Sequence, residues 1–137
     1  MAVSMLKTLR DARLNALNTA IGSTARIKIY DNSAGVPVTV DAPVLGTLLV
    51  TLTGNSAGFS TGASLQTLTA SEITAGTAGN SGTAAYARIC NSGGTAQCQC
   101  LVTVDGGGGD ITLTGTVLIT AGLPVNITSL VITEGNL

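Results

Sequence analysis

The apolar residues of segment 4–21 recur with the 3.6-residue period of an α-helix. Ser4 is placed to act as its N-cap and Gly22 as the glycine that ends it. Polar side chains fill the arc opposite the apolar one, so the helix is amphipathic. We therefore expect residues 1–22 to form a helical docking segment ahead of a β-domain that spans 23–137. The large side chains of the apolar arc are Leu6, Leu9, Leu14, Leu17 and Ile21.

Two arginines, Arg10 and Arg13, project into or beside this apolar arc. One interpretation is that their aliphatic stems pack against apolar neighbours while the guanidinium groups reach water. The other is that the helix docks on a partner that has acidic groups beside a hydrophobic groove. Under the second interpretation, the candidate contact residues on the helix are Leu6, Leu9, Arg10, Arg13 and Leu17.

After Gly22 the apolar period changes from 3.6 to 2, which is the period of β-strands. The runs are rich in Thr, Val and Ile, and Gly, Asn, Asp or Ser bounds them. No helical stretch separates them, so we expect an all-β fold, an antiparallel sandwich of the jelly-roll type with one N-terminal amphipathic helix. The predicted strands are 26–31, 48–53, 64–69, 84–90, 98–104, 110–120 and 125–133, with 36–40 as a further edge strand that contains Pro37.

Segment 54–83 is rich in Gly, Ser, Thr and Ala and is long for a connection inside a compact domain. Long loops of this kind are often functional. Phe59, the one phenylalanine of the chain, lies in this segment. Its ring either covers the hydrophobic core or anchors the loop in a neighbouring subunit. The second alternative adds Phe59 to the candidate contact residues.

Four consecutive glycines, 106–109, stand between two apolar runs. A phosphate-binding loop needs a Lys-Ser/Thr pair and a helix after its glycines, whereas a strand pattern follows here. Asp105 and Asp110 flank the glycines, and their carboxylates would repel a phosphate. We expect a flexible hairpin turn between strands 98–104 and 110–120. A calcium turn is the less favoured alternative, because calcium prefers six to eight oxygen ligands.

The chain has no histidine and three cysteines, Cys90, Cys98 and Cys100. The lack of histidine excludes His-based triads, imidazole acid–base catalysis and His metal ligands. Three cysteines at C-x7-C-x-C spacing do not supply the four ligands of a zinc site. Cys98 and Cys100 share one strand face, whereas Cys90 could meet one of them across the hairpin closed by 91–97. We expect three buried thiols, with no metal and no cofactor.

Charged residues make up only 9% of the chain and the net charge is −1. The usual charged share is about 25%, and a surface with so little charge favours association. We therefore expect a homo-oligomer, either a dimer or a trimer. The acidic residues are scattered and aromatic residues are scarce, so we assign no catalytic residue and expect no enzyme.

Three further classes are disfavoured by the distribution of charge and hydropathy. The slightly acidic balance argues against nucleic-acid binding. No apolar run reaches the ~18 residues of a membrane span. Charges at Lys7, Arg10, Asp11 and Arg13 stand where a secretory signal needs its apolar segment. We expect synthesis in the cytoplasm and no association with membrane.

Three stretches resemble one group of proteins: the start "MAVSMLKTLRDARLNALNTAIG", the run "RIKIYD" and the tail "VNITSLVITEGNL". In that group, which consists of small proteins encoded among tailed-bacteriophage structural genes, an "LRNARL"-like helix leads into an "LRIYDG"-like strand. The group's later glycine-rich turn and "D-I/M-x-L" strand are similar to Gly109–Leu113. Its C-terminal "S-x-x-I-T-x-G-N" is similar to Ser129–Asn136.

The resemblance implies a virion structural protein, most plausibly a capsid decoration or cementing protein on the capsid surface. Its partner would be the major capsid protein or another virion protein. Such a protein binds the assembled shell but not its free subunits, and so stabilises the shell by mass action. Two alternatives of other classes are a neck or tail-completion subunit and a carbohydrate- or receptor-binding module. The scarcity of aromatic residues disfavours the carbohydrate-binding module.

Overall fold

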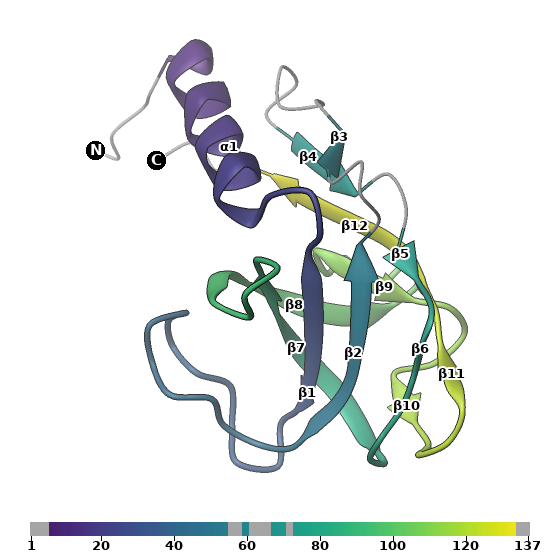
Figure 1. Ribbon diagram of the computed structural model, residues 1–137. Coiled ribbons are helices and arrows are strands. Elements are labelled where there is room, and N and C mark those ends of the chain that lie inside the picture. The colour runs from purple at the N-terminus through teal and green to yellow at the C-terminus, as the bar shows by residue number, and fades with distance from the viewer. Residues whose placement is uncertain (1–5, 55–58, 61–66, 71–72, 134–137) are drawn as a thin grey trace.

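A computed structural model describes residues 6–54, 59–60, 67–70 and 73–133 of the chain. These residues form one helix, α1 (Lys7–Ile21), and a set of mostly short strands (Figure 1). The strands are β1 (Arg26–Asp31), β2 (Leu48–Gly54), β3 (Phe59–Ser60), β4 (Thr67–Ala70), β5 (Ile73–Thr74), β6 (Gly76–Thr77), β7 (Gly82–Cys90), β8 (Ala96–Val104), β9 (Ile111–Leu113), β10 (Leu118–Ile119), β11 (Pro124–Val125) and β12 (Ile127–Thr133).

Helix α1 ends where the sequence predicts, at Gly22. This residue has φ +77°, and its N–H donates to the carbonyl of Asn18 over 3.0 Å. Glycine reaches this left-handed conformation without steric cost. The helix begins at Lys7, after Leu6, which supplies no side-chain cap. The predicted cap, Ser4, lies outside the described residues.

The described strands build one curled sheet in the order β3–β4–β12–β9–β8–β7–β1–β2–β5, with β10 beside β7. A second, two-stranded sheet pairs β11 with β6. The pairs are antiparallel except for β8 and β9. The predicted all-β class with one N-terminal helix is therefore confirmed.

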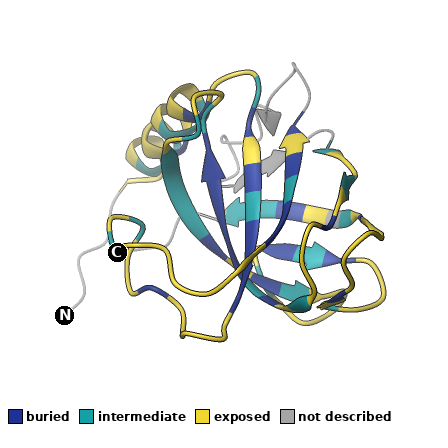
Figure 2. Ribbon diagram, turned by 60° about the horizontal axis from the view of Figure 1, so that its bottom comes forward, coloured by how far each residue is buried: buried dark blue, intermediate teal, exposed yellow. Residues whose placement is uncertain are grey.

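The core lies on the concave side of this sheet, where the inward residues of neighbouring strands meet. Ile29 of β1 pairs with Ala87 of β7, and Ala87 pairs with Cys100 of β8. All three are buried, as Figure 2 shows for the centre of the sheet. Leu14 and Ile21 of α1 are 1% exposed and belong to the same core. Burying each such aliphatic side chain contributes roughly 1.5–3 kcal/mol.

Several predicted strands differ from those in the structure. Segment 36–40 is not a strand but part of a long loop between β1 and β2. Predicted strand 110–120 forms two separate strands, β9 and β10. Predicted strand 125–133 contains Val125, the last residue of β11, and then all of β12. A tight turn interrupts the first of these runs. In this turn Gly115 has φ +78°, and the N–H of Thr116 donates to the carbonyl of Thr114 over 3.0 Å.

The tetraglycine segment is not the predicted hairpin turn. After it, β9 runs parallel to β8, with Val102 opposite Ile111 and Val104 opposite Leu113. The chain folds back along β8, and the N–H of Gly109 donates to the hydroxyl of Thr103 over 3.0 Å. Parallel strands usually need a longer crossover. Six residues, 105–110, suffice here because β9 pairs only with the last part of β8.

Glycine is required in this fold-back for steric reasons. A Cβ on Gly107 would lie 2.7 Å from the Cβ of Thr103. A Cβ on Gly109 would lie 2.9 Å from the carbonyl oxygen of Leu101. Real side chains do not approach so closely, so only glycine lets the segment lie against β8.

Candidate functional site

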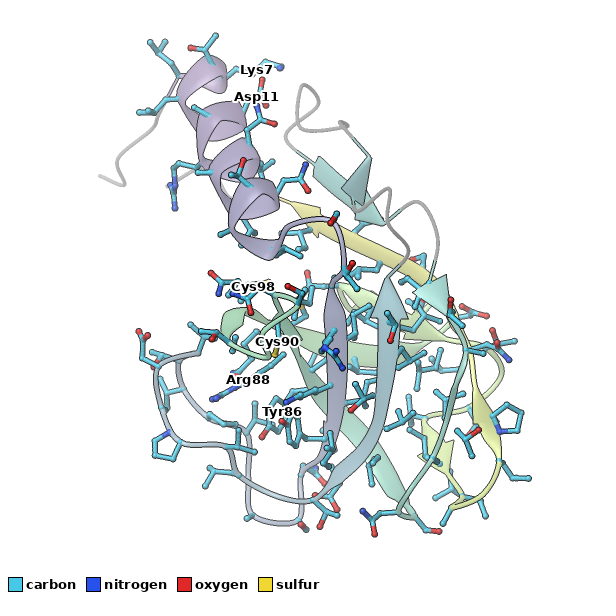
Figure 3. All side chains as sticks on the ribbon, viewed as in Figure 1. Lys7, Asp11, Tyr86, Arg88, Cys90 and Cys98 are labelled. Carbon is cyan, nitrogen blue, oxygen red and sulfur yellow. The ribbon has the colours of Figure 1, made fainter. Side chains whose placement is uncertain are left out.

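The first turns of α1 extend beyond the rest of the domain and form one candidate contact surface (Figure 1). Leu6 is 78% exposed and Leu9 is 50% exposed, so the apolar arc continues past the part that the domain covers. Arg13 is exposed and Arg10 is half-buried. Lys7 and Asp11 form an ion pair of 2.6 Å on this part of the helix, as Figure 3 shows.

The charge of this helical segment differs in sign from that of the remaining chain. Residues 1–22 contain three basic side chains and one acidic one, for a net charge of +2. Residues 23–137 contain three basic side chains and six acidic ones, for a net charge of −3. A basic, partly apolar helix surface is complementary to an acidic surface with an apolar groove.

The other predicted contact residues are placed differently. Leu17 is half-buried and packs against the core of its own domain, beside the buried Leu14 and Ile21. Phe59 lies in β3, where it pairs with Ala70 of β4. The side chain of Phe59 lies outside the described part of the chain, so its role as core lid or subunit anchor stays a prediction.

A second candidate surface is the long loop between β1 and β2, residues 32–47, which we call the strap. It crosses the face of β7 and β8 that is opposite their core-facing residues, and side chains from these strands hold its backbone. Arg88, 6% exposed on β7, donates from Nη2 to the carbonyls of Thr39 (3.3 Å) and Ala42 (2.6 Å). It also donates from Nε to the side-chain carbonyl of Gln99 over 3.2 Å.

Gln99 and Tyr86 complete the attachment on this face. The amide of Gln99 donates to the carbonyl of Pro37 over 2.7 Å. The hydroxyl of Tyr86 donates to the carbonyl of Leu45 and accepts the N–H of the same residue. The Tyr86 ring stacks on that of Tyr30, with centroids 5.1 Å apart. Figure 3 shows Tyr86 and Arg88 pointing from β7 toward the strap.

Asp31 holds the two ends of the strap together. Its Oδ1 accepts the N–H of Thr47 (2.8 Å) and both the N–H (3.2 Å) and the hydroxyl (2.8 Å) of Ser33. The bond from Thr47, followed by those from Ser33, holds the pKa of Asp31 below its usual value. Gly46 lies against this carboxylate, and a Cβ there would lie 2.5 Å from Oδ1.

Although its backbone is fixed, the strap leaves aliphatic side chains in water. Figure 2 shows most of the strap as exposed. Val38 is 95% exposed, and Leu101, which pairs with Tyr86 from β8, is 54% exposed on the same face. We call this set the strap patch; its members are Val36, Val38, Val44, Leu45 and Leu101.

The three cysteines are free thiols in the structure. Cys90 and Cys100 are buried, as expected, whereas Cys98 is half-buried. Burial raises the pKa of Cys90. A hydrogen bond between Cys98 and Cys100 lowers the pKa of the first and, with burial, raises that of the second. Cys98 and Cys100 occupy the same strand face, as predicted, opposite the inward residues Ile89 and Ala87 of β7.

Two hollows in the described part of the chain have no ionisable side chain in their lining. The first, of about 230 Å³, lies beside β9, β10 and β11 and is lined by Leu, Ile, Val, Pro, Thr and Asn side chains. The second lies along β2 and contains Asn80 as its one amide side chain. Across the described ranges, no three Cys, Asp or Glu residues gather in a group that could hold a metal ion.

The described part of the chain contains no helix that is both long and apolar enough to span a bilayer. No family model, no curated protein and no solved structure matches the chain. The candidate surfaces therefore depend on the residues and the geometry described above.

Proposed function

We propose that this chain is a non-enzymatic structural protein of a bacteriophage virion, a capsid decoration protein that binds and stabilises the assembled head. The observation that carries the proposal is the exposure of Leu6 and Leu9 in the first turns of α1, on the same helix as Arg10 and Arg13. A helix whose C-terminal half packs on its own domain, and whose N-terminal half is exposed, is suited to docking in a groove.

The chemistry of the remaining surface is consistent with a role in assembly. The two hollows lack acid–base groups, whereas most catalytic sites position such groups in a pocket. A decoration protein needs neither cofactor nor metal. It needs contacts that exist only on the assembled shell, and many copies of a modest contact then stabilise the particle.

The experiment is a binding assay with phage heads that were purified without this protein. The variant Arg10→Glu plus Arg13→Glu reverses the charge of the docking surface, because the net charge of residues 1–22 changes from +2 to −2. We expect it to lose head binding at physiological ionic strength while the β-sheet stays folded by circular dichroism. Binding at wild-type occupancy would show that α1 does not dock.

The matched control is Arg26→Glu, which reverses one exposed charge on β1 outside the helix. We expect this variant to decorate heads at wild-type occupancy. Counting copies per particle by mass spectrometry separates the alternatives. Copies that cover the head support decoration, whereas a single small ring of copies would assign the chain to the neck.

A further inference from the structure

The basic residues that follow α1 in the chain all lie on one face of the sheet. Segment 23–137 contains three of them, Arg26, Lys28 and Arg88. Lys28 of β1 stands directly opposite Arg88 of β7, and Arg26 occupies the next position of β1 on the same face. We call these three residues the basic face. The positions that pair with them on β2 and β8 are uncharged: Thr51, Thr53 and Gln99.

Two carboxylates lie on β1 and on the strap, and neither forms an ion pair with the basic face. Asp31 ends β1, and donors at both ends of the strap hold its carboxylate. Asp41 is exposed on the strap, between the two residues whose carbonyls accept from Arg88. The described residues contain no ion pair of Arg26, Lys28 or Arg88. The basic face therefore carries three positive charges beside one exposed carboxylate, although segment 23–137 has a net charge of −3.

The pair of Lys28 and Arg88 opposes the stability of the sheet. Like charges that stand directly opposite each other on neighbouring strands repel. Arg88 has a structural role, because it donates to two strap carbonyls and to Gln99. Lys28 is half-buried and makes no hydrogen bond within the part of the chain that the structure describes. A residue that opposes folding without a structural return is typical of a functional site.

The accessible part of the basic face fits a short acidic peptide segment. Arg26 and Lys28 are accessible beside threonine hydroxyls of β2, whereas Arg88 is 6% exposed. Carboxylates form strong hydrogen bonds with guanidinium and ammonium groups. A nucleic acid fits less well, because its backbone usually engages more cations. The two tyrosines of this face, Tyr30 and Tyr86, are also buried, so neither ring is available to stack on a base.

We propose that the basic face binds an acidic segment of a partner protein, whose carboxylates pair with Lys28 and Arg26. The segment lies across β1 and β2, beside the strap. Both strands are ordered on folding, so little entropy is lost on this side of the contact. The proposal does not rest on the proposed function, because it concerns a surface other than α1 and is tested without heads.

The test is fluorescence anisotropy of a labelled hexaglutamate peptide with the full chain, at low ionic strength because salt screens exposed charges. We expect Lys28→Glu to raise the dissociation constant at least about tenfold. The matched control is Arg13→Glu on α1, which changes the net charge equally, from −1 to −3. It should leave the dissociation constant within about twofold of the wild type. Arg26→Glu should weaken peptide binding and still decorate heads, which separates this surface from α1.

A neutral variant separates binding from folding. Lys28→Gln removes the repulsion from Arg88, so we expect a higher urea midpoint together with weaker peptide binding. A lower midpoint would overturn the proposal, because Lys28 would then have a structural role. So would a wild type that does not bind the peptide, or equal losses in Lys28→Glu and Arg13→Glu. Tighter binding of an oligothymidylate of equal charge, lost in Lys28→Glu, would assign the face to nucleic acid instead.

Discussion

At the scale of single residues, Asp31 shows how one carboxylate organises a loop of sixteen residues. Its Oδ1 accepts bonds from residues at both ends of the strap, Ser33 and Thr47. These donors stabilise the charged form and lower the pKa of Asp31. Since the folded pKa is depressed, the stabilisation is fully present above the pKa of the unfolded chain, about 3.9. It is lost as the pH falls through the lower folded pKa.

We therefore expect Asp31→Asn to lower the melting temperature at pH 7, because the amide is a weaker acceptor than the carboxylate. The difference from the wild type should shrink as the pH falls below about 4, where Asp31 of the unfolded chain takes up a proton, and disappear once the folded carboxylate is also neutral. Thermal melts from pH 7 down to about pH 2.5 measure both effects. A difference that stays constant over this range would contradict the assigned role of the charge. Asp41→Asn, at an exposed position within the strap, is the control.

At the scale of elements, β7 carries two buried faces with different chemistry. Ala87 and Ile89 point into the core, and Tyr86 and Arg88 point toward the strap. A buried guanidinium is stable only if its donors are satisfied. Arg88 meets this condition with two strap carbonyls and the amide of Gln99. The strap is therefore held by side chains and not by a ladder of backbone bonds.

Arg88→Met keeps an unbranched apolar stem and removes the guanidinium with its donors. We expect the free energy of unfolding to fall by about 1–3 kcal/mol, because buried carbonyls lose their partners. Amide hydrogen exchange should accelerate within 32–47 more than in β1 or β8. Arg26→Met removes an exposed arginine from the neighbouring strand and should change stability by no more than about 0.5 kcal/mol. Equal exchange rates in the strap of both variants would contradict the role of Arg88 in holding the strap.

The sequence predicted the strands that are buried on one or both faces, because this burial dictates where apolar residues occur along them. β1 agrees with its predicted range, and β2 and β7 agree to within two residues. The valine-rich run 36–40 was predicted as a strand because it alternates, yet Val38 lies in water. Alternation shows which residues could share a face, but not whether a neighbouring strand is available to pair with them.

The candidate surfaces could be predicted only in part. The exposure of Leu6 and Leu9 agrees with the predicted docking face, but Leu17 packs on its own domain. The attachment of the strap by Tyr86, Arg88 and Gln99 was missed, because its hydrogen bonds join residues 41 to 62 positions apart in the sequence. The one available signal was an arginine inside the otherwise uncharged run 84–90. The parallel β8–β9 pair was missed because glycines show where a chain can bend and not in which direction it continues.

At the scale of the whole molecule, helix and sheet share one core. Leu14 of α1 is 1% exposed and belongs to the same cluster as Ile29 and Ile89 of the sheet. The predicted boundary at residue 22 therefore separates two elements that pack on each other. The exposed N-terminal turns of the helix are therefore connected to the sheet through the buried Leu14 and Ile21.

A matched pair of leucine substitutions tests this shared core. Leu14→Ala should destabilise the entire domain by about 2–5 kcal/mol, because it leaves a cavity in the core. Leu9→Ala, at a 50% exposed position on the same helix, should change the stability by no more than about 0.5 kcal/mol. Urea unfolding monitored by circular dichroism of both helix and sheet gives the comparison. Separate transitions for helix and sheet would contradict a common core.

The position of β12 in the sheet has a consequence for synthesis. This strand, Ile127–Thr133, lies between β4 and β9 and joins the two parts of the curled sheet. A nascent chain that has reached β9 still lacks the strand that brings β4 and β9 together. The sheet can therefore be completed only after β12 has left the ribosome, and until then the edges of β4 and β9 that β12 covers stay unpaired and open to aggregation.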